Sequence, residues 1–214
     1  MRRKTDDTFY LARSAAPGPG VLVIHAWWGL NDFFKSVCDR LAEAGLVALA
    51  PDLYDGEIAT TAEEAKRLRA APKHDSVSKI LKRGIGRLQN EALATGGVGV
   101  VGFSMGAHWA YWLSHQPDLP ITATVAFYGV RDGDFTHSRS AFLTHLADQD
   151  EWVSAGAVQR VKKSLAAAGR EATFYTYPGT GHWFFEQDRA GVYDAAAADL
   201  AWRRTVEFLQ RRLA

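Results

Sequence analysis

The feature that most constrains this chain is a regular alternation of short apolar segments with longer amphipathic ones. Apolar, β-branched runs bounded by glycine or polar residues predict buried strands, and they lie at 21–27, 46–53, 98–104, 121–130, 141–147 and 172–179. Segments with apolar residues at helical spacing lie between them, at 31–45, 60–69, 76–93, 105–115, 155–169 and from about 193 onward. This alternation predicts an α/β protein with a mainly parallel sheet and helices on both faces. Function in such sheets gathers at the carboxyl ends of the strands.

The domain organisation is expected to be simple. With 214 residues, 47% of them hydrophobic, the chain can bury one core, and no repeat or low-complexity tract divides it. We therefore expect a single domain over 1–214, in which "AAPGPG" at 15–20 separates a lead-in segment, 1–20, from the rest. The loop after the strand at 121–130 is short, which argues against a separate cap domain.

Charge and cysteine content narrow the possible partners and compartments. The formal net charge is +1 with 23% charged residues, and the main basic run is Arg2-Arg3-Lys4. This balance favours a small-molecule partner over a nucleic acid or a membrane surface. The single cysteine, Cys38, allows no intramolecular disulfide, and no segment resembles a signal peptide or a spanning helix, so we expect a cytoplasmic protein.

Two glycine patterns overlap around residue 100. Gly97, Gly99 and Gly102 spell G-x-G-x-x-G, which in dinucleotide-binding proteins lies in the turn between a strand and a helix. Here the glycines lie before and within the expected strand. The context therefore disfavours an NAD-dependent oxidoreductase.

The second pattern, Gly102-Phe103-Ser104-Met105-Gly106, has the context that its chemistry requires. It follows an apolar strand and precedes a helix, as a nucleophile elbow does. Such a turn exposes the serine hydroxyl at the edge of the sheet. The backbone N–H of Met105, at a helix N-terminus, can then help to hold an oxyanion.

A serine nucleophile needs a base and an acid that orients the base. In this arrangement the chain order is Ser, then Asp or Glu, then His. Asp150 follows the strand at 141–147, and His182 lies in a glycine-rich loop after the strand at 172–179. Asp148 is a second candidate for the acid, and the residues alone do not separate it from Asp150.

The remaining histidines have no partner pattern. His108, one helical turn after Ser104, is expected to pack beneath the elbow rather than act as the base, and surface or core roles are expected for His74, His115, His137 and His145. No two histidines lie at a metal-ligand spacing, so no metal is expected. The second oxyanion amide should come from the loop after the first main strand, and we assign it to Trp27.

Taken together, these motifs resemble the dienelactone hydrolase family of α/β-hydrolases. The matching segments are "VIHAWWGLND", "CDRLAEAGLVALAPDLY", "GVVGFSMGA", "FYGV", "ADQDEWV" and "YPGTGHWF", which span the chain from about Val21 to the last helix. The resemblance implies a single-domain hydrolase without a metal or an organic cofactor. It implies a triad of Ser104, Asp150 and His182, and it selects Asp150 over Asp148 because the motif has the acid three residues before Val153. It also implies oxyanion amides at Trp27 and Met105.

The sequence departs from the family pattern at three positions. The best-known members have a cysteine nucleophile where this chain has Ser104, and an activating glutamate where it has Ala26. They also have an arginine that binds the substrate carboxylate four residues after the histidine, where this chain has Glu186. These departures predict that neutral short-chain or aryl esters are preferred over lactones with a free carboxylate.

The sequence thus predicts a serine hydrolase for a small ester or lactone, either a monomer or a homodimer. Trp28, Trp152, Trp183 and Glu186 are the expected pocket residues, although the tryptophans equally fit a role as core filling. Two alternatives use the same fold. One is a non-hydrolytic small-molecule-binding protein, and the other is an acyltransferase or perhydrolase that passes the acyl group to another acceptor.

Overall fold

The computed structural model describes residues 8–91 and 97–213. These residues form a seven-stranded sheet in the order β1-β3-β2-β4-β5-β6-β7. The strands are β1 (Phe9–Ala12), β2 (Gly20–Ile24), β3 (Val47–Pro51), β4 (Val98–Phe103), β5 (Ile121–Phe127), β6 (Ala141–Gln149) and β7 (Ala172–Gly181). All neighbouring pairs are parallel except β1 with β3, which is antiparallel. The predicted, mainly parallel sheet is therefore confirmed.

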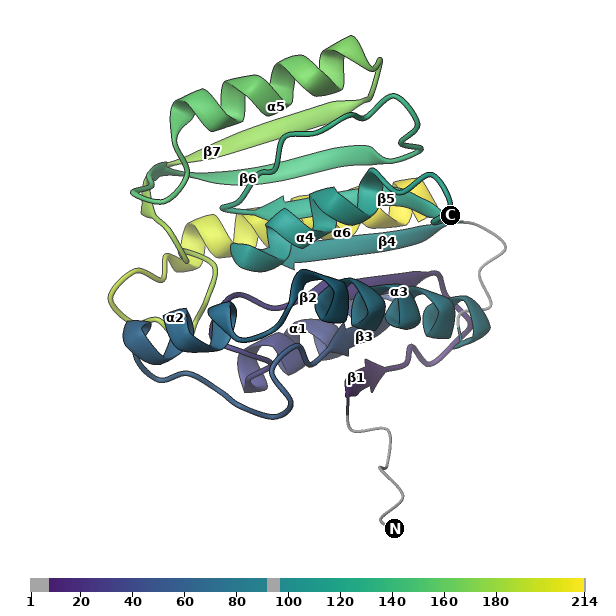
Figure 1. Cartoon of the computed structure of the whole chain (residues 1–214), viewed down its shortest axis with the longest axis horizontal. Coiled ribbons are helices and arrows are strands. Elements are labelled where there is room, and N and C mark those ends of the chain that lie inside the picture. Colours follow the sequence, from purple (N-terminus) through teal and green to yellow (C-terminus); the bar gives the residue numbers. More distant parts are fainter. Residues whose placement is uncertain (1–7, 92–96, 214) are drawn as a thin grey trace.

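Helices cover both faces of the sheet, as predicted. They are α1 (Asp32–Glu43), α2 (Ala62–Ala70), α3 (His74–Glu91), α4 (Met105–Ser114), α5 (Ala155–Ala167) and α6 (Ala195–Leu213). Figure 1 shows α3 and α4 in front of the sheet and α1 and α6 behind it. The predicted helix at 76–93 begins earlier, at His74, and its predicted end at Leu93 lies outside the described residues. No described helix is both long and apolar enough to cross a bilayer.

Side-chain caps define the starts of α1 and α2. The Asn31 side chain accepts a hydrogen bond from the N–H of Phe34 at 3.3 Å, and Thr61 and Glu64 form a complete capping box at the start of α2. Because these caps satisfy N–H groups that a helix leaves unpaired, they determine where α1 and α2 leave the loops that follow β2 and β3. Both loops border the site described below.

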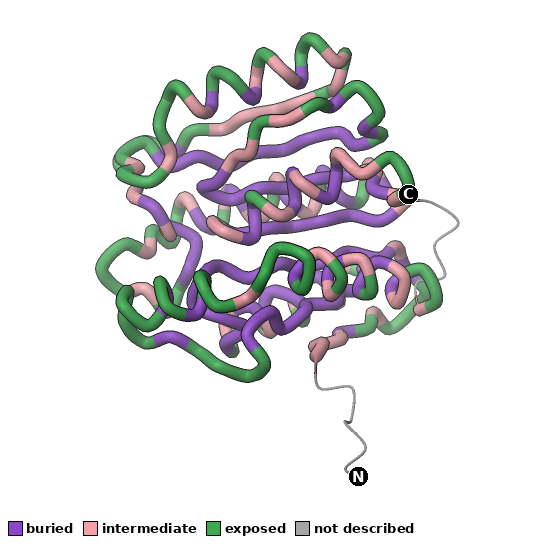
Figure 2. Tube along the Cα trace, viewed as in Figure 1, coloured by how far each residue is buried: buried purple, intermediate pink, exposed green. Residues whose placement is uncertain are grey.

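The core lies between the sheet and its helices. All residues of β2, β3 and β4 are buried, and the buried central strands contrast with the exposed outer helix faces in Figure 2. The strand predicted at 121–130 ends earlier, at Phe127, because Tyr128 takes a left-handed backbone conformation, with φ of 37°. The connection from β5 to β6, at 128–140, contains no helix, which agrees with the absence of a cap domain at this point.

Candidate active site

Ser104 lies in a sharp turn between β4 and α4. Its φ of 51° and ψ of −109° are strained for a residue with a side chain. A Cβ atom on Gly102 would lie 2.2 Å from the Gly106 oxygen, and one on Gly106 would lie 2.1 Å from the Ile24 oxygen. Only glycine fits at both positions, so the two glycines allow β4, α4 and β2 to approach closely around the serine.

A hydrogen-bonded chain runs from Ser104 to Asp150. The Ser104 Oγ lies 2.8 Å from His182 Nε2, and His182 Nδ1 lies 2.9 Å from both carboxylate oxygens of Asp150. Since a carboxylate can only accept, Nδ1 carries the proton and Nε2 is left to accept from the serine hydroxyl. This arrangement can take a proton from Ser104.

Backbone groups hold the Asp150 carboxylate in place. Its Oδ1 accepts hydrogen bonds from the N–H of Trp152 at 2.8 Å and from the N–H of Val153 at 3.0 Å. The Asp148 carboxylate is exposed and instead accepts from the N–H of Gly179 at 3.2 Å. Of the two candidate acids, only Asp150 contacts the histidine.

The two residues predicted to supply oxyanion amides line the same cavity as the serine. Met105 is the first residue of α4, where the N–H has no acceptor within the helix and the helix dipole favours a negative charge. Trp27 lies in the loop after β2. Within the part of the chain that the structure describes, neither N–H donates to a backbone oxygen. Both are therefore available to a substrate oxygen.

A residue that sequence reasoning missed holds the loop of Trp27. The buried His25 ring has Nδ1 2.6 Å from the Ala26 oxygen, and its Nε2 accepts from the N–H of Leu53 at 3.3 Å. Burial lowers the pKa of His25 to about 4, so the ring is neutral. His25 thus links the loop after β2 to the loop after β3. The position of His25 directly before the loop of Trp27 was a sequence signal from which this role could have been predicted.

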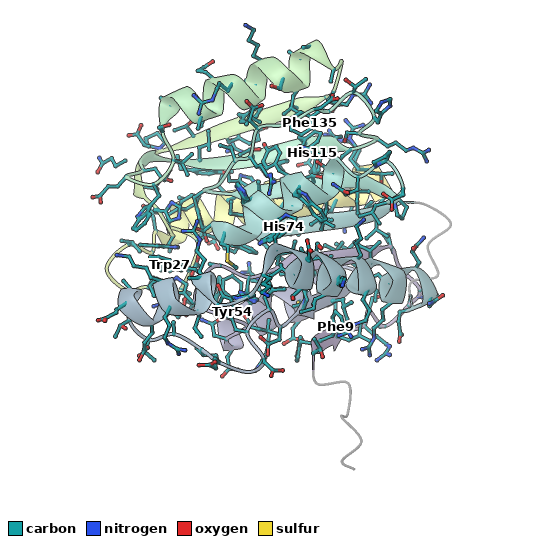
Figure 3. All side chains as sticks on the ribbon, in the orientation of Figure 1. Phe9, Trp27, Tyr54, His74, His115 and Phe135 are labelled. Carbon is teal, nitrogen blue, oxygen red and sulfur yellow. The ribbon has the colours of Figure 1, made fainter. Side chains whose placement is uncertain are left out.

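A cavity of about 390 Å³ opens onto Ser104 and His182. Two of the predicted pocket tryptophans, Trp152 and Trp183, line it together with Trp27, with ring centroids of Trp27 5.2 Å from Trp152 and 5.9 Å from Trp183. Trp27 is 5% exposed and Trp152 is 53% exposed, so the aromatic wall runs from the core to the surface. Figure 3 marks Trp27 with two further lining residues, Tyr54 and His74.

The prediction that Trp28 and Glu186 line the pocket is wrong, since neither borders the cavity. Trp28 packs against the guanidinium of Arg189, which lies 3.7 Å from the indole centroid. Glu186 is fully buried, and its Oε1 accepts from the hydroxyl of Tyr128 at 2.8 Å. The reason is a tight turn after His182, in which Trp183 has φ of 66° and the N–H of Glu186 donates to the Trp183 oxygen.

Another wall of the cavity is formed by arginine and histidine side chains, which no local sequence motif predicts. Arg69, His74, His108 and Arg131 line it, and no described lining residue is an aspartate or glutamate. Neither arginine forms an ion pair or a side-chain hydrogen bond within the described chain. Partial burial of His108 lowers its pKa to about 4, and the nearby Arg131, Arg69 and His74 add smaller effects in the same direction. His108 therefore faces the cavity, contrary to its expected place beneath the elbow.

Other chemically notable groups lie elsewhere. The buried His145 hydrogen bonds to the Tyr177 hydroxyl at 2.8 Å and to Thr205 Oγ1 at 3.0 Å, and burial lowers the pKa of His145 to about 3. Cys38 is a free, buried thiol inside α1. Among residues 8–91 and 97–213, no three His, Cys, Asp or Glu side chains are arranged to hold a metal ion.

Comparisons with known proteins identify the family of the chain. The profile of the dienelactone hydrolase family matches residues 7–213. "Protein usf" of Aquifex pyrophilus is 34% identical over 95% of this chain and 93% of its own. The "Putative carboxymethylenebutenolidase" of Aquifex aeolicus is 31% identical over 95% of this chain and 93% of its own.

The structure of a dienelactone hydrolase-like promiscuous phosphotriesterase from metagenomic libraries superposes with a TM-score of 0.83. It covers 94% of this chain and 89% of its own at 22% identity, which establishes a shared fold. The resemblance stated from the motifs is thereby confirmed. The chain belongs to the dienelactone hydrolase family of carboxylic ester hydrolases, on the α/β-hydrolase fold.

Proposed function

We propose that the protein is a serine hydrolase that cleaves a small carboxylic ester or lactone through an acyl-enzyme. The observation that carries this proposal is the continuous chain from Ser104 Oγ to His182 Nε2 at 2.8 Å and from His182 Nδ1 to Asp150 at 2.9 Å. The Ser104 end of this hydrogen-bonded chain faces the cavity, where a substrate carbonyl has access to the serine.

In the first half-reaction Ser104 Oγ attacks the carbonyl carbon while His182 Nε2 takes the hydroxyl proton. The N–H groups of Trp27 and Met105 stabilise the negative oxygen, and Asp150 stabilises the imidazolium. His182 then protonates the leaving alcohol, which in a lactone stays attached to the acyl group. Water, deprotonated by His182, hydrolyses the acyl-enzyme and restores Ser104.

We propose further that the substrate carries a negative charge. Arg69 and Arg131 present unpaired guanidinium groups to the cavity, and the Glu186 carboxyl, which as an anion in the pocket would repel a negative substrate, is buried away from it. The name of the Aquifex aeolicus relative denotes a carboxylate-bearing lactone, which supports the same class. This proposal replaces the expectation of a preference for neutral esters, because that expectation rested on Glu186 lying in the pocket.

For the setting of this activity, we propose a cytoplasmic monomer or homodimer that needs no cofactor. The support is chemical: the nucleophile, base, acid and oxyanion amides are all supplied by this chain, and the only cysteine is buried as a free thiol. Free thiols are typical of reducing compartments.

The experiment that tests the nucleophile is labelling with a fluorophosphonate probe, followed by peptide mapping. The adduct is expected on Ser104, and Ser104→Ala should abolish both the adduct and the burst of alcohol release from an aryl ester. Ser154, which caps α5 outside the cavity, provides the matched control, Ser154→Ala, which should keep the label. Hydrolysis that survives in Ser104→Ala at the parent rate would contradict the proposal. If the folded parent protein takes up no label and turns over no ester, a non-hydrolytic binding protein is favoured instead.

The proposed substrate charge is tested with two aryl esters of matched size, one with a terminal carboxylate and one with a neutral amide. Arg131→Gln and Arg69→Gln should each lower kcat/KM for the anionic ester by roughly 5- to 20-fold, more strongly at low salt, and leave the neutral ester nearly unchanged. Arg67→Gln is the control, since Arg67 pairs with Glu57 and does not border the cavity. An equal loss for both esters would show that the arginines support the wall rather than bind a charge.

A further inference from the structure

A buried acid lies one residue away from the catalytic histidine. Glu186 has no exposed surface, and its Oε1 accepts from the Tyr128 hydroxyl at 2.8 Å. The Tyr128 ring packs on the His182 imidazole, with centroids 4.9 Å apart and planes inclined by 58°. Tyr128 therefore lies between the Glu186 carboxyl and the histidine.

Tyr128 itself is held firmly. Its left-handed φ of 37° is unusual for a residue with a side chain, and its N–H donates to the His145 oxygen at 2.7 Å. Its ring also packs edge-on against Phe184, at 5.7 Å between centroids. A residue with so many contacts does not need a buried carboxyl for its placement, so the choice of glutamate at 186 calls for another role.

We propose that Glu186 is a positioning residue that acts through Tyr128 on His182, and that the charge on Glu186 sets the rate at which His182 works as a base. This inference rests on the proposed serine hydrolase function. It concerns a residue that borders neither the cavity nor the reacting atoms. Glu186 is therefore not a catalytic residue.

The surroundings of Glu186 determine when it becomes charged. The groups that face it are Tyr128, the first residue of the β5–β6 connection, and Asp188 and Arg189 of its own loop. Burial raises the pKa of Glu186 to about 8, while the Tyr128 hydrogen bond and Arg189 act in the opposite direction. Arg189 makes no hydrogen bond to it, because its guanidinium lies over the Trp28 ring. Glu186 is therefore neutral at pH 7 and negative above about pH 8.

The effect on catalysis follows from the charge of the transition state. His182 becomes an imidazolium as Ser104 attacks, so a carboxylate behind Tyr128 stabilises the transition state more than the neutral resting enzyme. Screening by water is weak there, since Glu186 and Tyr128 are buried. Ionisation of Glu186 should therefore raise the rate of acylation by roughly 3- to 10-fold.

The test is the pH dependence of kcat/KM from pH 5.5 to 10, measured with a neutral aryl ester after subtraction of the spontaneous hydrolysis. The wild-type profile should rise twice, and the second rise, near pH 8, is the one assigned to Glu186. Glu186→Gln keeps an acceptor for Tyr128 but cannot ionise, so it should show only the first rise. Glu57→Gln, at an exposed ion pair, should keep both.

Tyr128→Phe provides the second variant. Because the Tyr128 hydroxyl favours the ionised form of Glu186, its removal should move the second rise to higher pH without removing it. A second rise that persists unchanged in Glu186→Gln, or a wild-type profile with a single rise, would overturn the inference. Either result leaves the first rise and the Ser104 label intact, so the failure of this inference is distinguishable from failure of the proposed hydrolase.

Discussion

Asp148 and Asp150 are two residues apart at the end of β6, and only the second carboxylate lies against His182. Asp150→Asn keeps the shape of the side chain but removes its negative charge and replaces one acceptor oxygen with an NH2 donor, which disfavours the imidazole tautomer that carries its proton on Nδ1. We expect kcat for an activated ester to fall by roughly 10⁴-fold. Asp148→Asn alters only an exposed acceptor for the N–H of Gly179 and should change kcat less than about 3-fold. Steady-state kinetics of the two variants checks this, and a large loss in Asp148→Asn alone would reverse the assignment.

How far individual site residues can be predicted depends on whether a local motif carries them. Ser104, Asp150 and His182 each lie at or shortly after the end of a predicted strand, and the parallel sheet brings strand ends to one edge. Glu186 lies only four residues after His182, yet the turn at Trp183 directs it into the core. Arg131 borders the cavity from a loop without any motif. Side-chain direction in such loops depends on tertiary packing, which the sequence pattern does not reveal.

Among the elements, the loops after β2 and β3 form one unit through His25. The neutral ring donates to Ala26 and accepts from Leu53, so it fixes the loop that presents the Trp27 amide. His25→Phe preserves an aromatic ring but removes both hydrogen bonds. We expect kcat to fall by roughly 10- to 100-fold with a smaller change in KM, because the oxyanion donor acts mainly in the transition state.

The control for the loop prediction is His115→Phe. His115 lies at the end of α4 against Phe135, 4.3 Å between ring centroids, and does not border the cavity. Kinetics and thermal unfolding should be measured together for both variants. If His25→Phe retains the parent kcat in a folded protein, then the hydrogen bonds of His25 have no part in aligning the amide.

The elements themselves were predicted well where periodicity was strong and less well at the edges. β1 was not predicted, because "FYLA" at 9–12 is short and owes its strand conformation to antiparallel pairing with β3. β6 and β7 continue beyond their predicted ends, since Gln149 pairs with Gly181 across a register shift. Pairing of this kind is non-local, and hydrophobic patterns along one segment do not encode it.

At the scale of the whole molecule, Glu186 couples folding stability to pH. Its pKa rises from 4.5 in the unfolded chain to about 8 in the folded one. Between these values the unfolded chain gives up a proton that the folded chain keeps, so stability falls as pH rises from about 4.5 to 8. We therefore expect the free energy of unfolding of the parent to fall by a few kcal/mol between pH 5 and pH 9, relative to that of Glu186→Gln.

Urea unfolding of parent, Glu186→Gln and Glu57→Gln at pH 5 and pH 9 checks this prediction. The exposed Glu57 should show no such difference. Parallel stability curves for the parent and Glu186→Gln would mean that the Glu186 carboxyl keeps an ordinary pKa in the folded protein.

The arrangement of the whole sheet was predictable in outline, because alternating strands and helices have few ways to pack.

The backbone and the side chain of Trp152 have separate roles in the site. Its backbone N–H holds Asp150, whereas its indole, 53% exposed, forms part of the cavity mouth. Any residue except proline supplies that N–H. Natural variation at this position can therefore reshape the entrance and change which esters are accepted, while the acid stays anchored. During evolution, substitutions at position 152 can change substrate selectivity while every intermediate enzyme keeps its activity.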